Sequence, residues 1–297
     1  PIGHYAPNYQ KAIRVGFKAV KEEAEAKMQQ LEDEGLPGGA GAYNFYKGVS
    51  IVCGAMITYA KRYSAECARL AKECTDPKRK AELEQISETM GWIMENPARN
   101  FREAIQTVWF YQMCVLMDAN MHGTSIGRFD QFVGDFAERD IASGAITREE
   151  AQELIDLYYL KVAEQNKVWA ARTAASSPGY TSGQNITVGG IKADGSDATN
   201  VCTYMCLEAM GRMKMHSPVQ SLRVHQGTPK KLWECAIAVN KVNGGIPIFE
   251  SDEAIMPALM SRGIAKEDVW NYCIIGCVEP SIGGEEWPAC GGLGISS

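Results

Sequence analysis

A cysteine and a carboxylate lie two residues apart in the run GCVEP, from Gly276 to Pro280. A short apolar run, Tyr272 to Ile275, precedes them and a glycine-rich loop follows. In α/β sheets and barrels, ligands gather at the carboxyl ends of strands. The pattern therefore predicts a reaction centre at Cys277 and Glu279, presented at the end of a buried strand.

The chemistry of this pair depends on the state of the thiol. A free cysteine is most often a small buried hydrophobe, and a cysteine nucleophile takes a histidine to form its thiolate. His122, His216 and His225 are candidates, but a neighbouring carboxylate raises the pKa of a thiol. In an extended segment, Cys277 and Glu279 would face the same substrate. The pair suits a sulfur radical that takes a hydrogen atom from carbon, with the glutamate then removing a hydroxyl proton.

Five runs of sequence carry a family resemblance. They are GCVEP at Gly276–Pro280, MHGTSIGRFDQF at Met121–Phe132, PGYTSGQNITVGG at Pro178–Gly190, SLRVHQGTP at Ser221–Pro229 and GGIPIFESDE at Gly244–Glu253. In these runs the chain resembles the glycyl radical enzymes of the pyruvate formate-lyase type. It is similar to the branch that contains diol and hydroxyproline dehydratases, choline lyase and arylacetate decarboxylases.

The resemblance implies an α/β fold that is part of a ten-stranded barrel, made of two parallel half-sheets set antiparallel. It also implies that Cys277 becomes a thiyl radical and that Glu279 is the general base. The radical would come from a glycine near the C-terminus, placed there by a separate radical S-adenosylmethionine activating enzyme. The final run GGLGISS lacks the signature of that glycyl loop. We therefore expect residues 1–297 to be an internal segment of one such domain, without the glycyl radical region and inactive alone.

The resemblance implies an anaerobic lyase that cleaves a C–O or C–N bond, as dehydratases do. His122 matches a histidine of the diol dehydratases, and Asp118, Asn120 and Trp287 are further candidates for substrate binding. Diol dehydratases carry an aspartate shortly after a tryptophan, and none follows Trp287. This difference leaves an arylacetate decarboxylase as an alternative. A thiolate-dependent cysteine enzyme and an inactive fragment or scaffold also stay open.

Composition argues against several other classes of protein. A net charge of −6 lacks the basic excess of a nucleic-acid-binding protein, and no apolar run reaches the roughly 20 residues of a membrane helix. Ten scattered cysteines without a CxxC pair, and only four histidines, argue against a disulfide framework and a metal site. We expect a cytoplasmic protein that binds no cofactor in this segment. The full-length enzyme would act on a small molecule, as a homodimer.

The pattern of apolar residues differs between two parts of the chain. Residues 1–117 repeat apolar side chains every three or four positions, which predicts helices. The methionine and aromatic stripes of these helices, including that from Phe45 to Leu70, should form the core. Asp76 with Pro77, and Thr147 with Glu150, are typical of helix starts.

Residues 118–297 alternate short β-prone runs with helical ones, which predicts a parallel sheet with crossover helices. The expected strands are Asn185–Val188, Leu222–Val224, Ile246–Phe249 and Tyr272–Ile275.

Overall fold

A computed structural model describes residues 3–37, 39–118, 123–165, 171–176 and 183–286. The chain forms two compact units. One contains residues 10–114, and the other joins the first nine residues to the part of the chain from Val115 onward. The first unit is helical and the second is α/β, as the sequence predicts. The expectation of a single domain stays a prediction.

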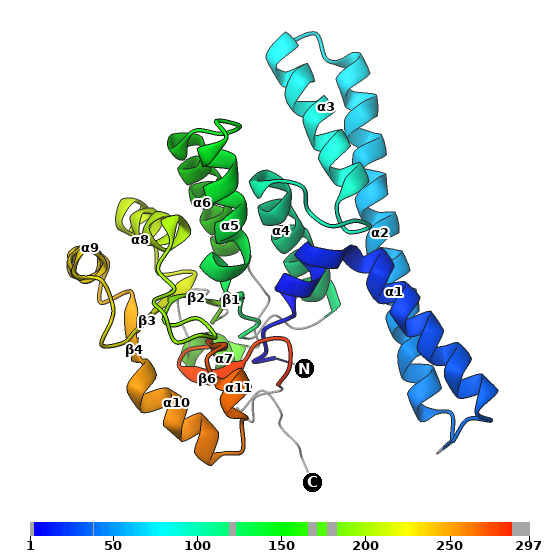
Figure 1. Ribbon diagram of the computed structural model, residues 1–297. Helices are drawn as coiled ribbons and strands as arrows, with labels where there is room; N and C mark the ends of the chain where they lie inside the picture. Colours follow the sequence, from blue (N-terminus) through cyan, green and yellow to red (C-terminus); the bar gives the residue numbers. More distant parts are fainter. Residues whose placement is uncertain (1–2, 38, 119–122, 166–170, 177–182, 287–297) are drawn as a thin grey trace. The chain divides into compact units, whose positions relative to one another are not determined.

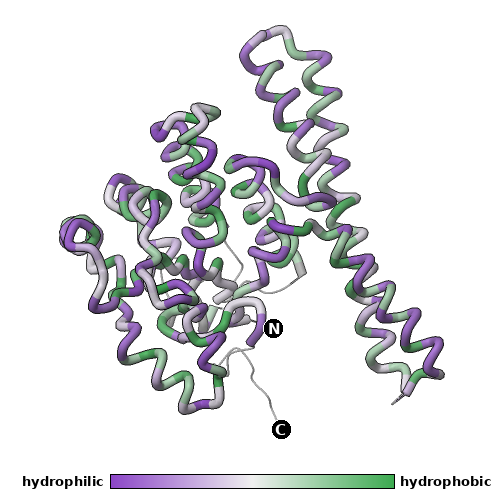
Figure 2. Tube along the Cα trace, in the orientation of Figure 1, coloured by the Kyte–Doolittle hydropathy of each residue, from purple (hydrophilic) through white to green (hydrophobic). Residues whose placement is uncertain are grey.

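The described part of the helical unit is built from long helices. Asp76 caps α3 by accepting the backbone N–H groups of Lys78 and Arg79, as predicted. Figure 2 shows polar and apolar residues interleaved along α2 and α3, and each helix buries a few of its side chains. The helices are α1 (Tyr9–Asp33), α2 (Gly41–Glu73), α3 (Pro77–Trp92) and α4 (Phe101–Asp118).

The core of the helical unit uses most, but not all, of the predicted stripes. Phe17, Met56, Met90 and Phe110 belong to one buried cluster. The start of α2 differs from the prediction, because Phe45 is 66% exposed. Helix α2 has 33 residues and α3 only 16, so α3 cannot cover the whole of its apolar side.

Parallel strands form the centre of the α/β unit, in the order β1-β2-β3-β4. Asn185 pairs with Val219, and Ser221 pairs with Ile248. The strands predicted around Asn185, Leu222 and Ile248 are therefore confirmed as members of one parallel sheet. The strands are β1 (Gly127–Arg128), β2 (Asn185–Gly189), β3 (Val219–Val224) and β4 (Ile248–Ser251).

Helices cover one face of this sheet. Helix α5 packs on β2, and α8 contacts α5, α6 and α9, so these helices lie side by side (Figure 1). The predicted capping box of Thr147 and Glu150 is present at the start of α6. None of the described helices is long and apolar enough to cross a membrane. The helices of this unit are α5 (Phe129–Ala142), α6 (Arg148–Ala163), α7 (Ala171–Ser176), α8 (Val201–Met213), α9 (Lys230–Val242), α10 (Asp252–Ser261) and α11 (Lys266–Val269).

The strand before the predicted reaction centre is not part of the parallel sheet, so that prediction was wrong. It is β5 (Tyr272–Ile275), and it pairs antiparallel with β6 (Glu279–Ile282). The chain reverses immediately after Ile275, so the next segment becomes its ladder partner. The hairpin contacts β1 and β2 through β5. An apolar run predicts that a strand is buried, but it does not identify the partner of that strand.

A buried ion pair joins this hairpin to the sheet. Arg223 on β3 is fully buried and donates to both carboxylate oxygens of Asp252, at 2.8 and 3.1 Å. It also donates to the carbonyl oxygens of Trp270 and Tyr272, at 2.9 and 2.8 Å. The hydroxyl of Tyr272 donates to Asp252 at 2.6 Å. Arg128 adds a second bond to the Trp270 carbonyl, at 3.0 Å.

Replacing Arg223 by Met should lower the free energy of unfolding by about 3–5 kcal/mol, because Asp252 would stay buried without its charge partner. Arg69→Met is the control, since Arg69 is 52% exposed and ion pairs at the surface add little stability. Urea unfolding of the two variants measures the difference. Equal, small losses of unfolding free energy in the two variants would show that the buried ion pair stabilises the fold no more than a surface ion pair does.

Candidate active site

Cys277 lies in the turn of the β5–β6 hairpin. Ile275 pairs with Glu279, so the turn consists of Gly276, Cys277 and Val278. Cys277 is exposed, whereas Cys273 on β5 is buried. The sequence-based expectation of an extended segment was wrong here, because the chain turns at Gly276 with a φ of 60°. The turn presents the Cys277 thiol at the tip of the hairpin.

Burial separates the two cysteines of the hairpin chemically. Burial raises the pKa of the Cys273 thiol to about 12, and this thiol donates to the carbonyl oxygen of Ser281. Cys273 therefore behaves as a small core residue. Of the two thiols, Cys277 is the one that a substrate can reach.

Glu279 is the first residue of β6, and its carboxylate meets a histidine from the start of the chain. His4 Nδ1 lies 3.0 Å from Glu279 Oε2. The side chains are only 8% and 24% exposed, so the pair is largely shielded from water. An imidazole next to a carboxylate fixes the orientation of that carboxylate.

Backbone hydrogen bonds hold the segment that carries His4. The carbonyl oxygen of Tyr5 accepts the N–H of Ser125 at 2.9 Å, and that of Ala6 accepts the N–H of Gly284 at 2.8 Å. Ala6 also packs with buried side chains of β5. The segment thus lies between the loop before β1 and the exit of the hairpin, and it brings His4 to Glu279.

Glycines make room for this pair. A Cβ atom at Gly276 would lie 2.5 Å from Glu279 Oε2 and 2.7 Å from His4 Cε1. A Cβ at Gly123 would lie 2.6 Å from His4 Cδ2. Gly183 approaches these two glycines, since a Cβ atom added to it would lie 3.7 Å from the Cα of Gly123 and 3.8 Å from the Cα of Gly276. The pair therefore lies where the backbones of three segments meet closely.

The structure describes only some of the predicted site residues. Cys277 lies in the hairpin turn and Glu279 is the first residue after it, and their catalytic roles stay predictions. His122, Asn120 and Trp287 lie outside the described residues, as does the side chain of Asp118 at the end of α4. Their roles in substrate binding stay predictions.

His225 is occupied elsewhere. Its Nδ1 accepts the N–H of Gly227 at 3.1 Å, and its Nε2 lies 3.0 Å from Asp197 Oδ1. One ring nitrogen thus serves the loop after β3, and the other meets the segment between β2 and α8. This histidine is therefore not available as the base of a thiolate mechanism.

His4 is the functional candidate that the sequence analysis did not find. It lies 275 residues from Glu279 along the chain, and nothing in its local pattern points to that distant carboxylate. The available signal is its rarity, because the chain has only four histidines. Weighing every histidine against the Cys277 motif would have included it.

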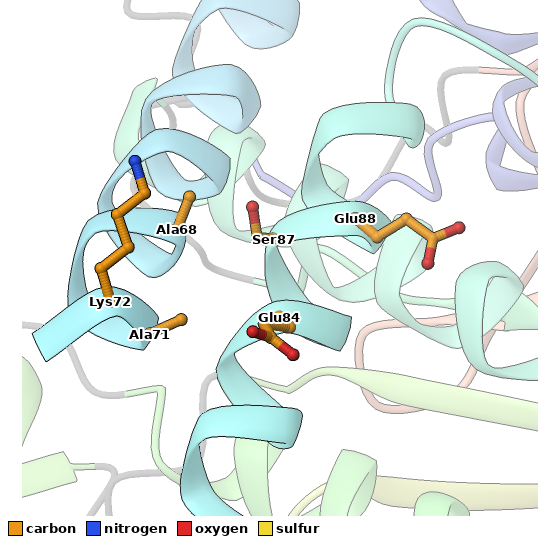
Figure 3. A pocket seen from close by; sticks show the side chains of 6 residues that line it. All are labelled: Ala68, Ala71, Lys72, Glu84, Ser87 and Glu88. Carbon is orange, nitrogen blue, oxygen red and sulfur yellow. The ribbon is translucent and has the colours of Figure 1, made fainter. Parts of the chain in front are cut away.

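A surface cavity of about 340 Å³ lies elsewhere, between α2 and α3 (Figure 3). The Ser87 hydroxyl at this cavity donates to the carbonyl oxygen of Ser64, so it serves helix packing. The described residues contain no group of three His, Cys, Asp or Glu side chains that could hold a metal ion. The hairpin turn is the stronger candidate. The cavity is lined by Ala68, Ala71, Lys72, Glu84, Ser87 and Glu88.

Known proteins share both the sequence and the fold of this chain. The isethionate sulfite-lyase of Nitratidesulfovibrio vulgaris is 34% identical over 293 residues, covering 97% of this chain and 35% of the relative. A solved structure from work on 1,2-propanediol dehydration in Roseburia inulinivorans matches with a TM-score of 0.88 and 36% identity. The match covers 95% of this chain and 35% of that one. The glycerol-bound, B12-independent glycerol dehydratase of Clostridium butyricum matches equally, with a TM-score of 0.88, 36% identity and coverage of 95% and 36%.

The chain thus spans about a third of the length of the relatives that it matches. The family model described as pyruvate formate lyase-like matches residues 1–295. Together with the cysteine and glutamate at the hairpin turn, this match shows that the chain belongs to the pyruvate formate lyase-like family of glycyl radical enzymes.

Proposed function

We propose that the complete enzyme is a glycyl radical lyase of the dehydratase type that acts on a small hydroxylated molecule. The observation that carries this proposal is the bond between His4 and Glu279 beside the turn of Cys277. It gives one site both a thiol for hydrogen-atom transfer and a carboxylate oriented for proton transfer. The similarity to a glycerol dehydratase and to a sulfite-lyase supports the same reaction class.

The two residues would act in sequence. A glycyl radical outside this segment would supply the unpaired electron. The sulfur radical of Cys277 takes a hydrogen atom from the carbon that bears the substrate hydroxyl, forming S–H and a carbon radical. That radical makes the hydroxyl more acidic, and Glu279 accepts its proton. The neighbouring C–O or C–N bond then breaks and the leaving group departs with its electron pair. The thiol returns a hydrogen atom to the product radical.

The wider setting of this site follows from the same proposal. The sheet of β1 to β4 would form part of a ten-stranded barrel, with the hairpin inside it. A radical S-adenosylmethionine activating enzyme would place the radical, and the complete enzyme would be a cytoplasmic homodimer. The parallel order of the described strands and the hairpin packed on β1 and β2 support the barrel in this proposal.

Replacing Cys277 by Ala should abolish turnover, because no sulfur remains to carry the hydrogen atom. The complete gene product would be activated anaerobically and offered isethionate, glycerol, 1,2-propanediol, trans-4-hydroxy-L-proline and an arylacetate. Electron paramagnetic resonance should still show the glycine radical in the variant. Cys273→Ala is the control in the same hairpin and should retain turnover. Product formation by Cys277→Ala would refute the assignment, and arylacetate as the sole substrate would favour a decarboxylase.

Replacing Glu279 by Gln should reduce kcat by about 10²- to 10⁴-fold, the usual contribution of a general base. The amide keeps the size of the carboxylate but cannot accept the hydroxyl proton. Glu285→Gln is the control, because Glu285 is exposed in the loop after β6. Steady-state rates, normalised to the radical content, provide the measurement. An unchanged rate in Glu279→Gln would mean that another group takes the proton.

Replacing Gly276 by Ala should cost about 1–3 kcal/mol more free energy of unfolding than replacing Gly195. Both glycines have a positive φ, 60° and 80°, so the backbone strain is similar. A Cβ at Gly195 would meet nothing within 4 Å, whereas at Gly276 it would collide with His4 and Glu279. Chemical denaturation compares the two variants. Equal losses would show that the pair tolerates the displacement.

A further inference from the structure

The edge of β5 that faces away from β6 is bonded to one side chain of the parallel sheet and one of the loop before β1. Along its other edge β5 pairs with β6. On the outer edge, the N–H of Ile274 donates to Thr187 Oγ1 at 2.8 Å, and the N–H of Gly276 donates to Ser125 Oγ at 2.9 Å. Both hydroxyl-bearing residues are fully buried. Two hydroxyl groups therefore accept the N–H of Ile274 in β5 and the N–H of Gly276 in the turn, directly before Cys277.

The Ser125 hydroxyl connects three segments that meet at the candidate site. It accepts the N–H of Asn185 at 3.1 Å in addition to that of Gly276, and it donates its own proton to the carbonyl oxygen of Gly123 at 3.3 Å. These bonds use its one proton and both of its lone pairs. The hydroxyl thus ties the hairpin turn to β2 and to the loop before β1.

Thr187 works in the same way one step further from the turn. Its hydroxyl donates to Asn185 Oδ1 at 3.4 Å, which leaves its lone pairs for the N–H of Ile274. The proton of the Ser125 hydroxyl goes to the carbonyl oxygen of Gly123, and that of the Thr187 hydroxyl goes to Asn185 Oδ1. Neither acceptor is therefore oriented by the hairpin.

We propose that Ser125 and Thr187 are positioning residues that fix the amides of Ile274 and Gly276 and thereby set the place of the Cys277 thiol. The catalytic part of this inference rests on the function proposed above. Cys277 follows Gly276 directly, so one peptide unit separates the fixed amide from the reacting residue. Glu279 is held on the other side of the turn by His4 and by the ladder to Ile275. Both ends of the turn are thus fixed.

Loss of either hydroxyl leaves a buried N–H without an acceptor, which favours a shift of the turn toward other partners. Hydrogen-atom transfer requires close approach, and a displacement of 1 Å can reduce a rate by about 100-fold. Loss of a hydroxyl should lower kcat and leave KM nearly unchanged, because neither hydroxyl is placed at the substrate.

The test uses the complete gene product in four forms: Ser125→Ala, Thr187→Val, Ser125→Thr and Ser221→Ala. Hydrogen–deuterium exchange of the resting protein, resolved to the amides of Ile274 and Gly276, measures the hydrogen bonds without any turnover. Exchange at Gly276 in Ser125→Ala, and at Ile274 in Thr187→Val, should rise by about tenfold or more. Ser125→Thr keeps the hydroxyl and should restore slow exchange. Ser221→Ala removes a buried hydroxyl of the same sheet that bonds Asn185, and it should leave both amides slow.

Turnover of the activated protein provides the second measurement. Per glycine radical, Ser125→Ala should lose about 100-fold in kcat while its KM changes by less than about threefold. Unchanged exchange, or an equal rise in Ser221→Ala, would overturn the inference. Faster exchange with an unchanged kcat would overturn its catalytic part. If Ser125→Ala does not fold, Thr187→Val replaces it as the test. This variant keeps the shape of the side chain, and the exchange of its Ile274 amide decides whether the hydroxyls fix the turn. If the wild-type protein forms no radical, the proposed function fails, while the exchange measurement still decides whether the hydroxyls fix the turn.

Discussion

The structure depends on keeping Arg223 and Asp252 charged in a buried place. Moving two ions out of water costs several kcal/mol each, and their attraction offsets this only where the remaining donors and acceptors also have partners. Arg223 meets this condition with the carboxylate of Asp252 and the carbonyl oxygens of Trp270 and Tyr272. Strand β3, the start of α10 and the start of β5 are thereby joined. The hairpin cannot slide along the sheet without separating a buried charge from its partners.

The two faces of the parallel sheet have different roles. Residues i and i+2 of a strand share a face, so Ile186 and Val188 lie on the face that α5 covers, whereas Asn185 and Thr187 lie on the other. That second face carries polar groups and is nevertheless buried, because the hairpin lies on it. The antiparallel hairpin is a separate sheet, so side chains take the place of a backbone ladder between the two sheets.

Local patterns in the sequence predict many of the helices and strands of this fold. They do not predict contacts between residues that are far apart in the sequence. Asp76 and Thr147 start helices because a cap depends on residues within one turn. The alternation of polar and apolar residues in NITVG identifies a strand, but it suggests a face toward solvent where the structure buries both faces. GCVEP predicts which residues react, yet the partner of β5 and the contact with His4 depend on tertiary packing that no local pattern encodes.

The contact between His4 and Glu279 also sets a time order for the assembly of the site. The two residues are 275 positions apart, and ribosomes add about 5–20 residues per second, so roughly 14–55 s pass between their synthesis. Throughout that interval the N-terminal segment lacks the strand against which it packs. The bond between His4 and Glu279 therefore cannot form on a growing chain until the hairpin has left the ribosome.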